Sequence, residues 1–141
     1  MKTVNVINTG LELGDVLSPA FALAYEQAMY STASGISEYR SGIWDVTTLT
    51  NEGWYFNLKG TELVPCVNDA AWWSGNLNPT CFSICVNIYV CSHLSFAFME
   101  AGQEKQSKLM ADNYYKLRDY FLQDDAPFSK DDVSKMLSFI D

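Results

Sequence analysis

The stretch that decides the fold is residues 78–100, NPTCFSICVNIYVCSHLSFAFME. Asn78 is a good helix cap and Pro79 is favoured at the first helical position, so a helix is expected to begin here. Apolar side chains fall on nearly every side of this helix, which predicts that other elements surround it. Polar residues interrupt the apolar run too often for a membrane span; they are Ser83, Asn87, Ser92, His93 and Ser95. The sequence therefore predicts a central, buried core helix.

Three further helices are predicted around this segment. Ser18-Pro19 repeats the signal of a cap followed by proline, and starts a helix over about residues 19–33. After Gly102, apolar residues at helical spacing predict an amphipathic helix over residues 104–122. Ser129 begins a capping box, which predicts a short C-terminal helix. The chain is thus expected to contain about four helices.

The middle of the chain has the pattern of antiparallel strands. Residues 43–50 and 54–58 are rich in β-branched and aromatic side chains, and the short turn 51–53 between them predicts a hairpin. Residues 63–67 are expected to form a third strand, in which Pro65 favours an edge or a bulge because it has no N–H to donate. The predicted fold class is α+β: one compact domain, with a small antiparallel sheet of about three strands packed with about four helices.

Length and composition support a single domain. The chain has 141 residues, of which 48% are hydrophobic, enough for one core and too few for two ordinary domains. Residues 18–141 are expected to form this domain, and residues 1–17, which show little periodicity, an extended or frayed N-terminal arm. The first residues lack the apolar segment of a signal peptide, so a cytoplasmic location is expected, with no membrane attachment.

The charge balance is acidic and disfavours nucleic acid as a direct ligand. The net charge is −8, and the few cations are spread thinly, whereas binding to a phosphate backbone needs clustered Lys and Arg. An acidic surface can keep a protein soluble or meet a basic surface on a protein partner. Asp124 and Asp125 are candidates for such a contact, although solvated carboxylates beside a turn and a helix start are the preferred explanation.

The aromatic residues supply a second candidate contact. Trp72 and Trp73 stand side by side in a segment rich in Ser, Gly and Asn, where both are hard to bury. Exposed tryptophans are common in protein interfaces. The pair is therefore a candidate partner contact, with ordinary packing over the sheet as the alternative.

Catalytic, cofactor and metal sites are not expected. His93 is the only histidine, so any Ser-His or Cys-His arrangement would have to use it, and its apolar surroundings favour a hydrogen-bonded core histidine. No Gly-rich phosphate loop is found. The four cysteines contain no C-x-x-C pair, which argues against zinc and favours free, buried, reduced thiols; they are Cys66, Cys81, Cys85 and Cys91.

Three stretches carry motifs with a family resemblance. Tyr39-Arg40-Ser41-Gly42-Ile43-Trp44 is followed by Leu49-Thr50-Asn51-Glu52-Gly53-Trp54-Tyr55, then by the apolar helix of residues 82–96, and then by residues 110–120 and the Phe139-Ile140-Asp141 end. In order and spacing they resemble the ArdB/KlcA antirestriction family, including its Tyr-x-x-Leu-Arg-x-Tyr helix. Ser41 and Glu52 stand where that family has glycine, so the chain is a divergent member by this resemblance.

The resemblance implies an α+β fold and carriage on phage, plasmid or other mobile DNA. It implies relief of type I restriction inside the bacterial cell, with a type I restriction-modification complex as protein partner, and it brings no catalytic residues. Two alternatives stay open: an acidic DNA-mimic inhibitor of a DNA-binding enzyme, and a small cytoplasmic interaction protein of a mobile element. A small hydrolase that uses His93 with Cys91 or an aspartate is a third reading.

Overall fold

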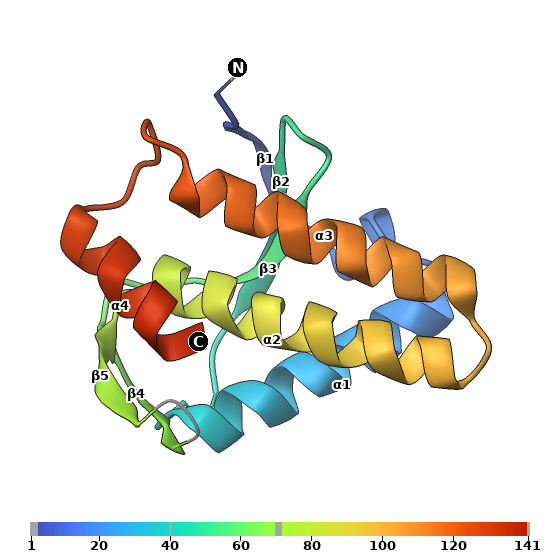
Figure 1. Cartoon of the computed structure of the whole chain (residues 1–141), viewed down its shortest axis with the longest axis horizontal. Coiled ribbons are helices and arrows are strands. Elements are labelled where there is room, and N and C mark those ends of the chain that lie inside the picture. Colours follow the sequence, from blue (N-terminus) through green and yellow to red (C-terminus); the bar gives the residue numbers. More distant parts are fainter. Residues whose placement is uncertain (1–2, 40, 70–71, 141) are drawn as a thin grey trace.

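Figure 1 shows the computed structural model of the chain, which describes residues 3–39, 41–69 and 72–140. Helix α2 (Pro79–Glu100) crosses the middle of the molecule; α3 (Glu104–Leu122) runs antiparallel beside it, and α1 (Pro19–Ile36) and α4 (Lys130–Ile140) also pack on it. A short 3-10 helix, η1 (Leu13–Asp15), precedes α1. The strands are β1 (Val6–Leu11), β2 (Trp44–Leu49), β3 (Trp54–Leu58), β4 (Val64–Asn68) and β5 (Trp73–Leu77). The predicted α+β class, with four helices and antiparallel pairing, is confirmed.

The strands form two sheets rather than one. In the first, β2 and β3 make the predicted hairpin, with Thr47 opposite Tyr55. The third predicted strand does not join that hairpin, because β4 pairs with β5 in a separate two-stranded sheet. Pro65 lies in β4, where its carbonyl accepts a hydrogen bond from the N–H of Glu38 at 3.0 Å. Among the described residues β5 is the one strand that pairs with β4, as the edge prediction for Pro65 requires, and the other edge of β4 carries an isolated antiparallel bridge between Cys66 and Ser37.

The sequence does not predict β1 and β5. Strand β1 lies within residues 1–17 and pairs with β2, with Asn8 opposite Thr48, in a register that shifts twice. Most of its side chains are exposed, so no alternation of apolar and polar residues marks it. Strand β5 has the sequence WSGNL, in which Gly75 pairs with Cys66. Both strands are identified only by their backbone pairing, and the pattern of apolar and polar residues does not predict them.

Helix α2 is the centre of the core along its first half. The side chain of Asn78 accepts a hydrogen bond from the N–H of Cys81 at 2.8 Å, and Pro79 occupies the first turn, so the predicted start is confirmed. Ten of the residues from Cys81 to Cys91 are buried, Tyr89 being the exception. By length and composition α2 is the one described helix that could cross a membrane, and 56% of its most apolar window is buried in the protein. The predicted core helix is thus correct for this half.

Buried amide side chains from the helices satisfy the free edge of β3. Asn113 accepts a hydrogen bond from the N–H of Trp54 at 3.0 Å and donates to its carbonyl at 2.9 Å. Asn87 makes the same pair of bonds with Phe56, at 2.9 and 2.8 Å. A buried backbone group without a partner is costly, so these side chains replace the missing neighbouring strand.

Ser83 extends this row of bonds by one step. Its hydroxyl accepts from the N–H of Leu58 at 2.8 Å and donates to the carbonyl of Pro79 at 2.6 Å. The three polar side chains that bond to β3, Ser83, Asn87 and Asn113, are fully or almost fully buried. Ser83 and Asn87 therefore bind α2 to the edge of β3. They are two of the polar residues that interrupt the apolar run of the helix.

Candidate functional site

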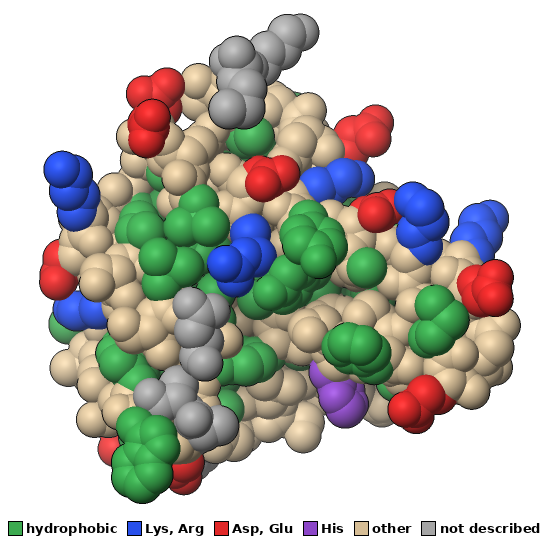
Figure 2. All heavy atoms as spheres, viewed as in Figure 1, with side chains coloured by type: hydrophobic (Ala, Val, Ile, Leu, Met, Phe, Trp, Pro, Cys, Tyr) green, Lys and Arg blue, Asp and Glu red, His purple; other side chains and the backbone are tan. Residues whose placement is uncertain are grey.

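The second half of α2 and the facing part of α3 leave an open groove between them. Its volume is about 430 Å³. Figure 2 shows exposed hydrophobic side chains gathered over these two helices. Phe96, Met99 and Tyr115 line the groove although they are 70%, 54% and 64% exposed. We name it the α2–α3 groove; its lining residues are Ser92, Ser95, Phe96, Met99, Ser107, Ala111, Tyr114 and Tyr115.

The groove offers apolar and aromatic contacts rather than charge. None of the described residues that line it is charged. The hydroxyls of Ser95 and Ser107 donate to the backbone carbonyls of Ser92 and Ser95, at 2.7 and 2.6 Å, so they serve the helix pair. At its border the guanidinium of Arg118 lies 5.7 Å from the centre of the Tyr114 ring, a cation–π contact. Aromatic residues, Met and Arg are the types enriched at protein interfaces.

The structure separates the two adjacent tryptophans. Trp72 is 96% exposed and its backbone has a positive φ of 54°, a conformation that costs roughly 1 kcal/mol for a residue with a side chain. Trp73 is half-buried and packs edge-on against Phe139, with 5.1 Å between ring centres. Trp72 presents nearly its whole side chain to solvent. Trp73 packs against the core, which is the alternative interpretation of the tryptophan pair.

Asp124 and Asp125 lie in the exposed loop between α3 and α4. The carboxylate of Asp125 accepts a hydrogen bond from the hydroxyl of Thr3 at 3.1 Å. Beside it, the amide side chain of Gln123 makes two hydrogen bonds, both 2.7 Å, with the backbone of Val4. In Figure 1 this loop lies near the top of the view and strands β4 and β5 lie near its bottom, so the structure separates the aspartates from β5, which directly follows Trp72.

The prediction that His93 is a hydrogen-bonded core residue is wrong. His93 is exposed, as Figure 2 shows for the single histidine, and it bonds to none of the described side chains. The elements that cover the first half of α2 do not reach over this position. Cys91 is 0% exposed and contacts the Tyr25 hydroxyl at 3.6 Å and the Asn113 amide at 3.5 Å. Residues two apart on a helix do not face each other, so Cys91 and His93 form no catalytic pair.

The cysteines are free and buried, as predicted. Burial raises the pKa of the Cys66 thiol to about 12 and the pKa values of Cys81 and Cys91 to about 11. It raises the pKa of Cys85 well above its ordinary value too. These thiols are neutral at pH 7 and therefore poor nucleophiles, since the thiolate is the reactive form.

The first sequence motif has a structural role. The indole N–H of Trp44 donates to the hydroxyl of Tyr39 at 2.8 Å, and the two rings meet edge-on at 5.4 Å. A side chain at Gly42 would place its Cβ 2.5 Å from a methyl group of Leu58, so a larger residue here would have to displace the Leu58 side chain. Arg40 of this motif, like Asp141 at the end of the chain, lies outside the described residues.

The turn between β2 and β3 explains the second motif. The side chain of Asn51 accepts from the N–H of Gly53 at 2.9 Å and donates to the carbonyl of Lys116 at 3.1 Å, which ties the turn to α3. Glu52 has a φ of 69°, the left-handed conformation that glycine adopts without strain. Glu52 adopts this conformation at a cost of roughly 1 kcal/mol, which a glycine at the same position would avoid.

The carboxylates do not form a row on the face seen in Figure 2. The acidic side chains are scattered near its outline and are interspersed with basic ones. Three acidic residues are also engaged in ion pairs, Asp45 with Lys59, Asp112 with Lys108 and Asp131 with Lys135. This distribution does not resemble regularly spaced phosphates, so it gives the DNA-mimic reading no support on this face.

Sequence reasoning missed Phe96, Met99 and Tyr115 as surface residues. The apolar pattern of residues 79–100 has no polar stripe, and it gave no sign that the helix leaves the core halfway along. The one available signal is the cluster of Ser92, His93 and Ser95, which marks the point where burial ends.

Comparison with known proteins supports the resemblance. A family model described as antirestriction protein matches residues 37–127, more than half of the chain. A search of curated proteins finds no match. A solved structure matches with a TM-score of 0.77 and 15% identity, over 99% of this chain and 96% of that one, and so shares the fold. It is described as showing the fold of the KlcA and ArdB proteins, with antirestriction activity against type I DNA restriction systems in vivo but not in vitro. The chain belongs to the antirestriction protein family.

Proposed function

We propose that this protein relieves type I restriction of incoming phage or plasmid DNA in the bacterial cytoplasm, by binding a protein of the restriction system and without catalysis. Membership of the antirestriction family supports the general activity. The structural neighbour has activity against type I systems in vivo, which supports the choice of target. The proposed partner is therefore a subunit of a type I restriction-modification complex.

The observation that carries the protein-contact mechanism is the α2–α3 groove. Phe96, Met99 and Tyr115 expose large apolar surfaces next to one another, and such patches on a soluble protein mark binding surfaces. The groove has an uncharged lining and Arg118 at its border, which is the composition typical of the centre of a protein interface. The exposed, unpaired position of His93 and the buried, neutral thiols offer no arrangement for nucleophilic catalysis among the described residues.

The activity is tested by plating unmodified phage on a host that carries a type I restriction system, with and without the gene. Plating efficiency is expected to rise when the protein is present. Unchanged efficiency against several type I systems would contradict the proposed function.

The groove is tested with a Phe96→Ser/Met99→Ser double variant in the same assay. It is expected to keep the wild-type circular dichroism spectrum and to lose relief of restriction by at least about tenfold, the effect of one lost contact of about 1.4 kcal/mol. Leu23→Ser is the matched control, because Leu23 is 57% exposed on α1, away from the groove. Full relief by the double variant would exclude the groove as the contact.

Trp72 is a second proposed contact. Trp72→Ala removes a 96% exposed side chain and is expected to leave the melting temperature unchanged, whereas Trp73→Ala loses the packing against Phe139 and is expected to lower it. Recovery of type I restriction subunits by the tagged protein should fall with Trp72→Ala alone. Equal recovery by wild type and Trp72→Ala would remove this residue from the interface.

A further inference from the structure

A second apolar site lies at the other side of α3, near the beginning of α1. Two adjoining cavities, of about 340 and 10 Å³, share Leu17, Phe21, Gln106 and Leu109 in their linings. We name the larger cavity the α1–α3 slot; the smaller one lies beneath it and has room for no more than about one water molecule. The larger cavity opens at the surface, and the smaller one reaches the buried residue Tyr25. The volume is at the lower end of the range for small-molecule sites.

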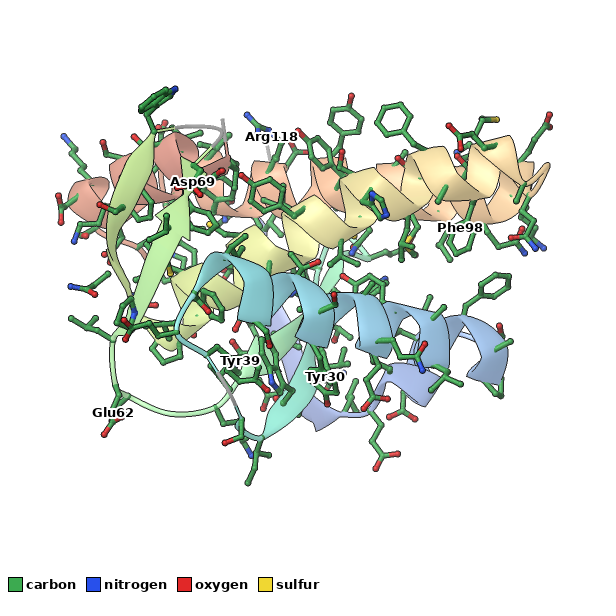
Figure 3. The ribbon with its side chains drawn as sticks, turned by 90° about the horizontal axis from the view of Figure 1, so that it is seen from below. Tyr30, Tyr39, Glu62, Asp69, Phe98 and Arg118 are labelled. Atoms are coloured by element: carbon green, nitrogen blue, oxygen red, sulfur yellow. The ribbon has the colours of Figure 1, made fainter. Side chains whose placement is uncertain are left out.

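The floor of the slot is apolar. Phe21 of α1 meets Phe98 of α2 edge-on at 5.4 Å, and both rings line the smaller cavity. Figure 3 shows Phe98 on the side of α2 that faces α1. Leu17 is buried, and Leu109 is 43% exposed at the boundary between the two cavities. A ligand that entered here would remove apolar surface from water, which is favourable by about 25 cal/mol per Å².

The outer part of the slot carries positive charge on an otherwise acidic protein. Its charged lining residues are Lys105, Lys108 and Asp112, two cations and one anion, whereas the chain has a net charge of −8. The ammonium group of Lys108 is paired with Asp112 at 3.0 Å. Lys105 is exposed and forms no ion pair with any described residue. One unengaged cation thus stands beside an apolar cavity.

We propose that the α1–α3 slot binds a small amphipathic anion, with an aliphatic chain along Leu17, Phe21 and Leu109 and a carboxylate on Lys105. A free fatty acid of medium length has this chemistry. The long apolar stem of Lys105 can lie along the slot while its ammonium meets the carboxylate at the surface. A charge-assisted hydrogen bond of this kind discriminates strongly against a cationic head group. The site is separate from the α2–α3 groove, and the proposal does not depend on the antirestriction activity.

The test is isothermal titration calorimetry of the intact protein with decanoate below its micelle concentration. Saturable binding of one decanoate per chain is expected. Decyltrimethylammonium has a chain of the same length with a cationic head, and no binding of it is expected. Absence of saturable decanoate binding, or equal binding of the two amphiphiles, would overturn the proposal.

Variants separate the two parts of the slot. Lys105→Glu is expected to weaken decanoate binding at least tenfold, and Leu109→Gln to weaken it through the apolar part. Lys130→Glu, an exposed charge reversal on α4, is the matched control and should bind as the wild type does. Equal affinity of Lys105→Glu and wild type would contradict the role of Lys105. In a separate arm, phosphatidylglycerol vesicles should not capture the protein; capture without decanoate binding would indicate a lipid surface instead and overturn the proposal.

Discussion

The two halves of α2 have similar sequences and opposite environments. From Cys81 to Cys91 nearly every side chain is buried, with β3, α1, α3 and α4 packed around the helix. From Ser92 to Glu100 every residue is at least partly exposed, and Phe96 is 70% exposed although Phe82, on the same helix, is 0% exposed. In the first half the apolar residues build the core, whereas in the second half Leu94 and Phe98 still pack on the core and Phe96 and Met99 are left at the surface. Hydrophobicity by itself does not tell which of the two an apolar helix provides.

The buried half makes the protein sensitive to alkali, and this is the largest effect we expect. Burial raises the pKa of Cys81 and Cys91 to about 11 in the folded protein, above the ordinary value of 9.0 that holds when the chain is unfolded. Between these pH values the unfolded state loses protons that the folded state keeps, so the free energy of unfolding falls as pH rises. Each thiol lowers it by about 1.4 kcal/mol per pH unit.

Urea unfolding at pH 7, 9 and 10.5 checks the alkaline effect. The unfolding midpoint should be constant up to about pH 8.5 and then fall. Cys81→Ala should show a shallower fall than wild type, because one titrating group is removed. A midpoint that does not change up to pH 10.5 would mean that the thiols of the first half are less well shielded than the structure shows.

Truncation of one phenylalanine in each half tests the comparison directly. Phe82→Ala leaves a cavity in the core and is expected to reduce the free energy of unfolding by about 3–5 kcal/mol. Phe96→Ala, the matched change at an exposed position, should change it by less than about 0.5 kcal/mol. Chemical denaturation of both variants gives the two values. Similar losses would show that the second half is covered in solution.

Removal of a buried amide tests whether polar residues hold the first half on the sheet. Asn87→Ala leaves the N–H and the carbonyl of Phe56 without their partner and removes the acceptor of the Tyr25 hydroxyl, which keeps only its contact with Cys91. The expected loss is about 2–4 kcal/mol, because unsatisfied buried groups cost roughly 1–3 kcal/mol each and water can reach some of them. The loss is measured by urea unfolding, and amide hydrogen exchange at Phe56 should become faster. A loss below about 1 kcal/mol would contradict the role of Asn87.

A pair of serines gives the smallest expected difference. Ser83→Ala removes a buried hydroxyl that bonds to Leu58 and Pro79, and should cost about 1–3 kcal/mol. Ser95→Ala removes a half-buried hydroxyl that bonds within its own helix, and should cost less than about 0.5 kcal/mol. Thermal unfolding of the two variants ranks them. If Ser95→Ala is the more damaging of the two, the bond from Ser107 to the Ser95 carbonyl depends on that hydroxyl more than the geometry suggests.

Local signals in the sequence predicted the local parts of the fold well. Asn78 with Pro79 and the amphipathic pattern of residues 104–122 fixed helix positions, because caps and periodicity act over a few residues. The same reasoning placed His93 in the core and did not find Phe96 at the surface. The elements that could cover His93 and Phe96 come from distant parts of the chain. The sequence of residues 92–100 does not show how far those elements extend.

The sequence by itself determined that this is one α+β domain with a central apolar helix, buried thiols and a family motif built on Tyr39 and Trp44. Only the tertiary structure decided that Asn87 and Asn113 complete the edge of β3, that Trp72 and Trp73 have different environments, and that one side of α2 is exposed after Cys91. The physical reason is that burial and hydrogen-bond pairing depend on what lies opposite a residue in space, whereas helix and turn signals depend on its neighbours in the chain.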